Sequence, residues 1–138
     1  AGQVDLVLRS TMLGREDEFW CIDYKTTDPA PKFRGGPPNL LGCNTGPSRF
    51  GVKHAPHPFS EFEASEWNKY VAQLNCYGYM AASQYNVDFR DRMCLLQIHP
   101  SLGAPNLVRV ERMDDVMEEL FALEVSKMPK SDSATELF

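Results

Sequence analysis

The amino-acid sequence predicts a single α/β domain with a central mixed β-sheet of about four strands flanked by helices. Four short apolar segments have the composition of strands, and a long segment of helical period separates the second from the third. A second helical segment follows the fourth strand. This order fits an α/β core in which a helix connects a hairpin to the remaining strands. We expect the domain to span residues 1–128, followed by a polar tail at 129–138.

The first two strands are predicted to form a hairpin. Residues 4–8 and 19–25 have strand character, and the polar turn at 13–17 has the length of a hairpin connection. The segment Phe19-Trp20-Cys21-Ile22 is aromatic and β-branched, which indicates a buried strand.

Asp23-Tyr24-Lys25, at the end of this hairpin, is the most informative feature of the chain. Side chains alternate between the faces of a strand, so Asp23 and Lys25 lie side by side while Tyr24 points away. Pairing of the two strands would bring Asp5 close to that face. Carboxylate oxygens suit Mg²⁺, which keeps several waters for a phosphate substrate. A lysine beside such a water can neutralise charge as phosphorus is attacked.

The alternative interpretation of these three residues is a surface ion-pair cluster on an exposed strand. The neighbouring side chains disfavour it, because they are apolar and imply a covered sheet: Val4, Leu6, Trp20 and Ile22. Half-buried carboxylates next to one another need a cation.

Residues 28–60 form an insertion with seven of the ten prolines and five of the nine glycines. Proline and glycine disfavour a long helix or a central strand, so we expect a loop, either a substrate-facing flap or a disordered segment. Between Pro29 and Ser60 its charged residues are all positive, which fits contacts with a nucleic-acid backbone, although a solvated basic loop is equally compatible. The candidate nucleic-acid-binding residues are Lys32, Arg34, Arg49 and Lys53.

The main helix is predicted at residues 65–83, with Ser60 or Ser65 as its N-cap. Its apolar stripe comprises Trp67, Val71, Leu74, Gly78 and Ala81. Gln73 and Tyr77 lie one turn apart at the border of this stripe. Ordinary core packing of Tyr77 and a solvated position for Gln73 are the alternatives to a functional role.

Two further strands and a final helix complete the prediction. Residues 93–98 are almost wholly apolar, which indicates a central strand, and residues 107–110 form the next strand. Asp114 is expected to cap a helix at 115–127 whose apolar stripe packs on the sheet.

The composition limits the location and the partners of the protein. Four widely spaced cysteines indicate reduced thiols of an intracellular protein, in the cytoplasm or the nucleus. No apolar run is long enough to cross a membrane, and no signal-peptide pattern is present. The net charge of −5 disfavours tight, nonspecific DNA binding by this chain alone.

Three motifs together resemble the PD-(D/E)XK nuclease superfamily, and specifically its RecB-like branch. They are Gly2-x-x-Asp5, Asp23-Tyr24-Lys25 and Gln73-x-x-x-Tyr77, in the order and on the elements that this branch uses. The resemblance covers residues 2–28 and 65–100. It implies a restriction-endonuclease-like core.

The resemblance also implies an activity, that of a metal-dependent deoxyribonuclease. Asp5, Asp23 and the backbone carbonyl of Tyr24 would hold Mg²⁺ or Mn²⁺, and Lys25 would lie beside the attacking water. Gln73 would reach the site from the helix, with Tyr77 one turn along. RecB-like enzymes usually supply a further ligand from a helix upstream of the first strand. Because this chain begins directly before that strand, we expect it to be the nuclease domain of a larger protein.

Several alternatives remain open from the sequence. The chain could be an inactive nuclease-fold domain that binds nucleic acid or a protein partner, or an RNA endonuclease of the cap-snatching type. Exonuclease and endonuclease action are not distinguished by these motifs. A zinc site at His54 and His57 with Cys43 is disfavoured by its loose spacing.

Overall fold

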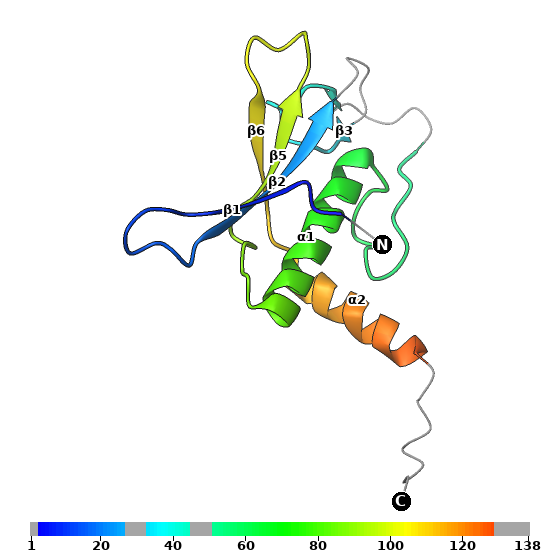
Figure 1. The fold of residues 1–138 in the computed structure, drawn as a ribbon. Helices are drawn as coiled ribbons and strands as arrows, with labels where there is room; N and C mark the ends of the chain where they lie inside the picture. The colour runs from blue at the N-terminus through cyan, green and yellow to red at the C-terminus, as the bar shows by residue number, and fades with distance from the viewer. Residues whose placement is uncertain (1–2, 27–32, 45–50, 129–138) are drawn as a thin grey trace, which may run out of the picture.

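The computed structural model describes residues 3–26, 33–44 and 51–128. A four-stranded sheet with strand order β1-β2-β5-β6 lies at its centre, and two helices accompany it (Figure 1). β1 and β2 are antiparallel, β2 and β5 are parallel, and β5 and β6 are antiparallel. The predicted α/β class with a mixed four-stranded sheet is therefore confirmed. The elements are β1 (Leu6–Arg9), β2 (Phe19–Thr26), β3 (Phe33–Arg34), β4 (Cys43–Asn44), α1 (Glu66–Tyr85), β5 (Met93–Ile98), β6 (Asn106–Val110) and α2 (Asp114–Lys127).

The parallel pairing of β2 with β5 explains why the chain needs α1 between them. Parallel neighbours begin at the same edge of the sheet, so the chain must cross back over one face before the second strand starts. The register sets Asp23 opposite Leu95 and Lys25 opposite Gln97. β5 lies between β2 and β6, which confirms the prediction of a central strand at 93–98.

The hydrophobic core lies between α1 and one face of this sheet. Side chains that alternate along the strands meet the apolar stripe of the helix, as the two periods predict. The buried members from the sheet are Cys21, Met93, Leu95, Val108 and Val110, and those from α1 are Val71, Leu74 and Tyr77. At Gly78, a Cβ atom would lie 2.9 Å from Arg90 Cγ and 3.3 Å from Met93 Sδ. The helix therefore approaches β5 more closely there than a larger residue would allow.

α1 begins and ends as its sequence predicts, within two residues. Ser65 is the N-cap, and its Oγ accepts a hydrogen bond of 3.2 Å from the Asn68 backbone N–H. The C-terminal end is at Asn86, which adopts the left-handed conformation with φ of 55°. Asparagine tolerates this conformation better than most residues because its short polar side chain bonds locally.

The insertion at 28–60 is expected to be a loop, but residues 33–44 contain two short strands and contribute to the core. β3 and β4 pair in parallel, and Phe33 is 2 % exposed within the core. Leu40 is also buried. A high count of proline and glycine predicts irregular backbone. It gives no information on whether large apolar side chains in the same segment, here Phe33 and Leu40, pack into the core beside α1.

α2 differs from expectation in its cap and in its packing. The helix includes Asp114, and no side chain caps its start. Instead, the buried amide of Asn75 in α1 accepts a hydrogen bond of 2.7 Å from the Met113 backbone N–H. The packing partner of α2 is α1, where Phe121 stacks on Tyr79 with ring centroids 4.7 Å apart. An apolar stripe predicts burial of a helix face, but it does not say against which layer.

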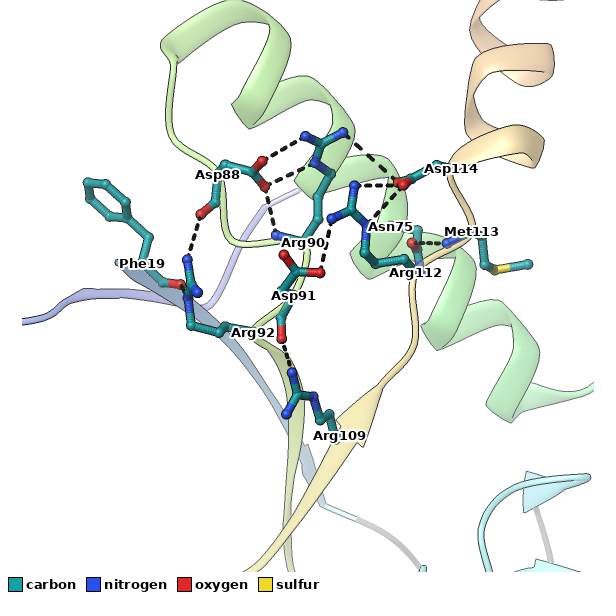
Figure 2. Close-up of polar contacts among 10 residues, drawn as sticks. All are labelled: Phe19, Asn75, Asp88, Arg90, Asp91, Arg92, Arg109, Arg112, Met113 and Asp114. Carbon is teal, nitrogen blue, oxygen red and sulfur yellow. Dashed lines mark hydrogen bonds and ion pairs between the residues drawn. The ribbon is translucent and has the colours of Figure 1, made fainter. Parts of the chain in front are cut away.

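A network of ion pairs joins the start of β5, the end of β6 and the start of α2 (Figure 2). Arg112 pairs with Asp91 at 2.9 Å and with Asp114 at 2.6 Å. Arg90 pairs with Asp88 at 2.6 Å, and its hydrogen bonds lower the pKa of the Asp88 carboxyl to about 2. The network fixes the chain where it leaves the sheet for α2.

All four cysteines are free thiols, as expected. Cys21 and Cys94 are buried, and burial raises the pKa of the Cys21 thiol to about 12. A thiol that resists ionisation is a poor nucleophile, so Cys21 is a structural residue. Neither helix of the described chain has the length and apolar character needed to cross a membrane.

Candidate functional site

Asp23 and Lys25 form an ion pair on the face of β2 that meets α1. The Lys25 ammonium contacts Asp23 Oδ2, and the two side chains are 18 % and 5 % exposed. Tyr24, between them, points to the other face of the sheet and is exposed. The predicted alternation along this strand is therefore confirmed. It places a carboxylate and an ammonium together in a nearly enclosed position.

Asp5 lies beside this pair, just before β1. The antiparallel register of β1 with β2, in which Leu6 faces Ile22, brings the Asp5 side chain to the end of β2. Its Oδ2 accepts a hydrogen bond of 2.9 Å from the Tyr24 backbone N–H. The expectation that the hairpin would bring Asp5 close to Asp23 and Lys25 is confirmed. Asp5 is exposed, so this side of the cluster is open to solvent.

The Asp23 carboxyl lies in surroundings that disfavour its charge. Burial raises its pKa above the usual value, the Lys25 ammonium opposes this rise, and the neighbouring Asp5 carboxylate adds to it. Asp23 Oδ2 is buried and accepts no hydrogen bond of normal geometry from the described residues, although the Lys25 ammonium lies against it. Among the described residues, this buried oxygen has Lys25 as its one positive partner.

These donors fit a hard divalent cation. Mg²⁺ needs only one or two protein carboxylates and completes its shell with water. Asp5 and Asp23 would supply the carboxylates and Tyr24 a backbone carbonyl. Among the described residues, no group of three or more acidic, histidine or cysteine side chains converges as a metal cage. The donor set therefore suits a hydrated ion more than a tetrahedral zinc site.

Gln73 and Tyr77 are neighbours on α1, as predicted from their spacing. Gln73 Nε2 donates a hydrogen bond of 2.9 Å to the Tyr77 hydroxyl. Tyr77 is buried in the core with its hydroxyl satisfied. Within the described chain, the Gln73 amide makes no hydrogen bond to Asp5, Asp23 or Lys25. The structure thus brings three of the five predicted catalytic residues into one cluster and holds the other two together on the adjoining helix.

Tyr70 is a member of the site that sequence reasoning did not select. Its ring centroid lies 4.0 Å from the Lys25 ammonium, a cation–π contact. The spacing contained a signal, because Tyr70 lies three residues before Gln73 and seven before Tyr77, on one helix face. The ring also contacts Phe33, with centroids 5.8 Å apart.

Gln97 is a second residue that sequence reasoning missed. It is paired in register with Lys25 and is 0 % exposed. Its amide accepts from the Leu41 N–H and donates to the Leu41 carbonyl, both at 2.8 Å. The segment 33–44 is thereby fixed beside the end of β2. A glutamine inside an otherwise apolar strand was the available signal.

The predicted nucleic-acid-binding residues have different surroundings. Arg34 forms an ion pair of 3.0 Å with Glu63, and Lys53 is exposed. Lys32 and Arg49 lie outside the described residues, as do Gly2 of the first motif and the predicted tail at 129–138.

The two histidines considered for zinc contact different groups. His54 Nδ1 lies 2.9 Å from the Ser60 carbonyl oxygen, and His57 lies 3.3 Å from Glu119. Nothing in these contacts brings the two imidazoles to a common position.

A hollow lined by residues of α1, β6 and α2 lies away from the carboxylates. It has a volume of about 650 Å³ and lies between α1, β6 and the start of α2. Trp67, Arg109 and Met113 are among its lining residues. The carboxylate cluster is instead reached from the surface at Asp5.

Comparison of the chain with protein-family models, curated proteins and solved structures finds no match. What the protein does must therefore be inferred from the chemistry of its own residues.

Proposed function

We propose that this chain is a metal-dependent nuclease domain that hydrolyses phosphodiester bonds in DNA with Mg²⁺ or Mn²⁺. The observation that carries the proposal is the buried Asp23 Oδ2, which lies beside a second carboxylate and, within the described part of the chain, has Lys25 alone as its counter-ion. This combination of two carboxylates and an ammonium suits phosphoryl chemistry better than acyl or redox chemistry.

Each residue has a role in this proposal. Asp5, Asp23 and the Tyr24 carbonyl would hold the ion, which polarises a phosphoryl oxygen and stabilises the departing oxygen when bound. Lys25 orients the attacking water and neutralises the charge that develops on the phosphoryl oxygens. Gln73 would reach the site from α1, where its amide donates a hydrogen bond to the Tyr77 hydroxyl.

The reaction needs no covalent intermediate. The oxygen of a water molecule forms the new bond to phosphorus as the opposite phosphorus–oxygen bond to the sugar breaks, and the proton of the water passes to solvent. The exposed position of Asp5 suits a long polymer, which would approach the site from the surface. Lys53, with Lys32, Arg34 and Arg49, would contact the backbone of that polymer.

A noncatalytic role is the second candidate, and one observation favours it. Among the described residues only two carboxylates meet, and Gln73 is bonded to Tyr77 instead of to the cluster. A nuclease-fold domain with such a site would bind nucleic acid or a protein partner equally well with or without a metal ion.

Cleavage assays distinguish these candidates. The purified chain would be incubated with end-labelled single- and double-stranded DNA and with RNA, in Mg²⁺, Mn²⁺ or EDTA. Asp23→Asn should abolish cleavage, with a loss of at least about 100-fold. Asp17→Asn, which changes an exposed carboxyl in the β1–β2 turn, is the matched control and should leave it unchanged.

The products and the binding data complete the test. The product ladder separates exonuclease from endonuclease action, and preferential cleavage of RNA would favour the cap-snatching alternative. Mn²⁺ binding, followed by electron paramagnetic resonance, should be lost in Asp23→Asn. A protein that binds DNA equally in Mg²⁺ and EDTA, with no Mn²⁺ site and no cleavage, would overturn the nuclease proposal.

A further inference from the structure

The Lys25 ammonium has two partners of opposite character. On one side it contacts Asp23 Oδ2, and on the other it lies 4.0 Å from the centre of the Tyr70 ring. With 18 % of its side chain exposed, Lys25 is largely withdrawn from water. These two contacts come from different elements, β2 and α1, so their relative position is fixed by the packing of the helix on the sheet.

On the Asp23 side, the ammonium lies where a divalent cation would need to be. Asp23 Oδ2 is buried and has no other positive or hydrogen-bonding partner among the described residues. Two cations within a few ångströms of one oxygen repel each other strongly when water is excluded. Lys25 and a divalent cation therefore compete for this oxygen.

On the Tyr70 side, the ring offers the ammonium a second partner that does not depend on Asp23. The face of an aromatic ring attracts a cation within about 6 Å of its centroid. Phe33, which is buried in the core, contacts the same ring with centroids 5.8 Å apart. The ring therefore has support on the side of the segment 33–44, and it can keep an ammonium close to the site without returning it to water.

We propose that Lys25 is the built-in counter-ion of the metal-free site and that Tyr70 positions its ammonium when a divalent cation takes Asp23 Oδ2. This inference rests on the proposed function and deepens it, because it assigns Lys25 a competitive role before catalysis. Tyr70 is a positioning residue, since it acts through Lys25 and touches neither the ion nor the substrate.

Mn²⁺ affinity tests the competition in the whole chain. Lys25→Met removes the competing charge and should bind Mn²⁺ at least about tenfold more tightly than the wild type. Tyr70→Leu removes the aromatic ring that would hold the Lys25 ammonium once a divalent cation takes Asp23 Oδ2. This variant should bind Mn²⁺ more weakly, by about two- to fivefold. Tyr70→Phe keeps the ring face and should match the wild type. Circular dichroism of each variant controls for folding.

Nuclear magnetic resonance tests the position of the ammonium without activity. The ring current of Tyr70 should shift the Lys25 Hε protons upfield in the metal-free protein. The shift should persist in Tyr70→Phe, vanish in Tyr70→Leu, and remain after Mg²⁺ is added to the wild type. Loss of the shift on addition of Mg²⁺ would overturn the positioning role of Tyr70.

The outcomes separate this inference from the proposed function. Mn²⁺ binding that is lost in Asp23→Asn but not tightened in Lys25→Met would overturn the competition and leave the nuclease proposal standing. Absence of Mn²⁺ binding from both the wild type and Lys25→Met would overturn the nuclease proposal and the competition together. Mn²⁺ binding by Lys25→Met but not by the wild type would support the competition and would explain a wild type without nuclease activity.

Discussion

At the scale of single residues, Asp23 is a candidate site residue whose buried charge is expected to destabilise the folded protein. Its carboxyl lies in the core layer beneath α1, with Asp5 nearby and, among the described residues, Lys25 as its counter-charge. Core positions of this kind normally carry apolar side chains, because burying a charge costs free energy unless it is well paired. Functional residues commonly carry such a cost.

The cost can be measured as a dependence of stability on pH. The folded-state pKa of Asp23 is raised, chiefly by burial, so the folded protein binds the Asp23 proton more tightly than the unfolded chain does. Stability should therefore fall as pH rises from 3.8, the usual pKa of an aspartate carboxyl, through the raised pKa of Asp23. Asp23→Asn removes this dependence and should be more stable than the wild type at pH 7 by about 1 kcal/mol.

Urea unfolding between pH 3 and pH 7 checks this prediction. The two proteins should converge in stability toward low pH, where Asp23 is protonated in both states. Lys25→Met removes the partner of the buried charge instead of the charge itself. It leaves the Asp23 carboxylate unpaired and should therefore destabilise the protein at pH 7. An Asp23→Asn variant that is less stable than the wild type at pH 7 would show that the Lys25 pair outweighs burial.

At the scale of elements, the Gln97 side chain links the segment 33–44 to β5. The side-chain amide of Gln97 bonds the Leu41 backbone as a neighbouring strand would. It accepts a hydrogen bond from the Leu41 N–H and donates one to the Leu41 carbonyl, both at 2.8 Å. Gln97→Leu would leave the Leu41 N–H and carbonyl without these partners. We expect a loss of about 1–3 kcal/mol in unfolding free energy, because unsatisfied buried polar groups are costly.

Hydrogen exchange at Leu41 provides the local measurement for this variant. The Leu41 amide should lose protection in Gln97→Leu, whereas protection in the middle of α1 should stay. Gln84→Leu, the same change at an exposed position of α1, is the control and should alter neither quantity. Unchanged protection of Leu41 would mean that Phe33 and Leu40 hold the segment without the amide.

The elements also show what a single sequence can predict. The start and the apolar face of α1 follow from Ser65 and from the spacing of Val71, Leu74 and Gly78, which are local features. The pairing of Gln73 with Tyr77 is equally local. By contrast, the contacts of Tyr70 with Lys25 and of Gln97 with Leu41 join residues 45 and 56 positions apart, because 70 − 25 = 45 and 97 − 41 = 56. Such contacts depend on how the layers pack, and no local pattern specifies them.

At the scale of the whole molecule, the core cluster of the described residues lies between α1 and one face of the sheet. α1 covers the face that carries Asp23 and Lys25, and α2 packs on α1 and runs away from the sheet (Figure 1). The opposite face is apolar yet exposed at several positions: Leu8, Tyr24, Ile98 and Leu107. The two faces of one sheet should therefore contribute very differently to stability.

Two identical substitutions on neighbouring strands measure this difference. Leu95 of β5 faces α1 and is 1 % exposed, whereas Leu107 of β6 lies on the opposite face and is 52 % exposed. Leu95→Ala should cost about 2–5 kcal/mol, since it removes transfer free energy and leaves a cavity. Leu107→Ala should cost less than about 1 kcal/mol, because its side chain already meets water. Urea unfolding of both variants supplies the two values, and each variant controls for the general effect of shortening a strand leucine. Equal costs would mean that the exposed face is covered in solution, in which case the core would have two layers around the sheet and the carboxylate cluster would lie deeper within the protein.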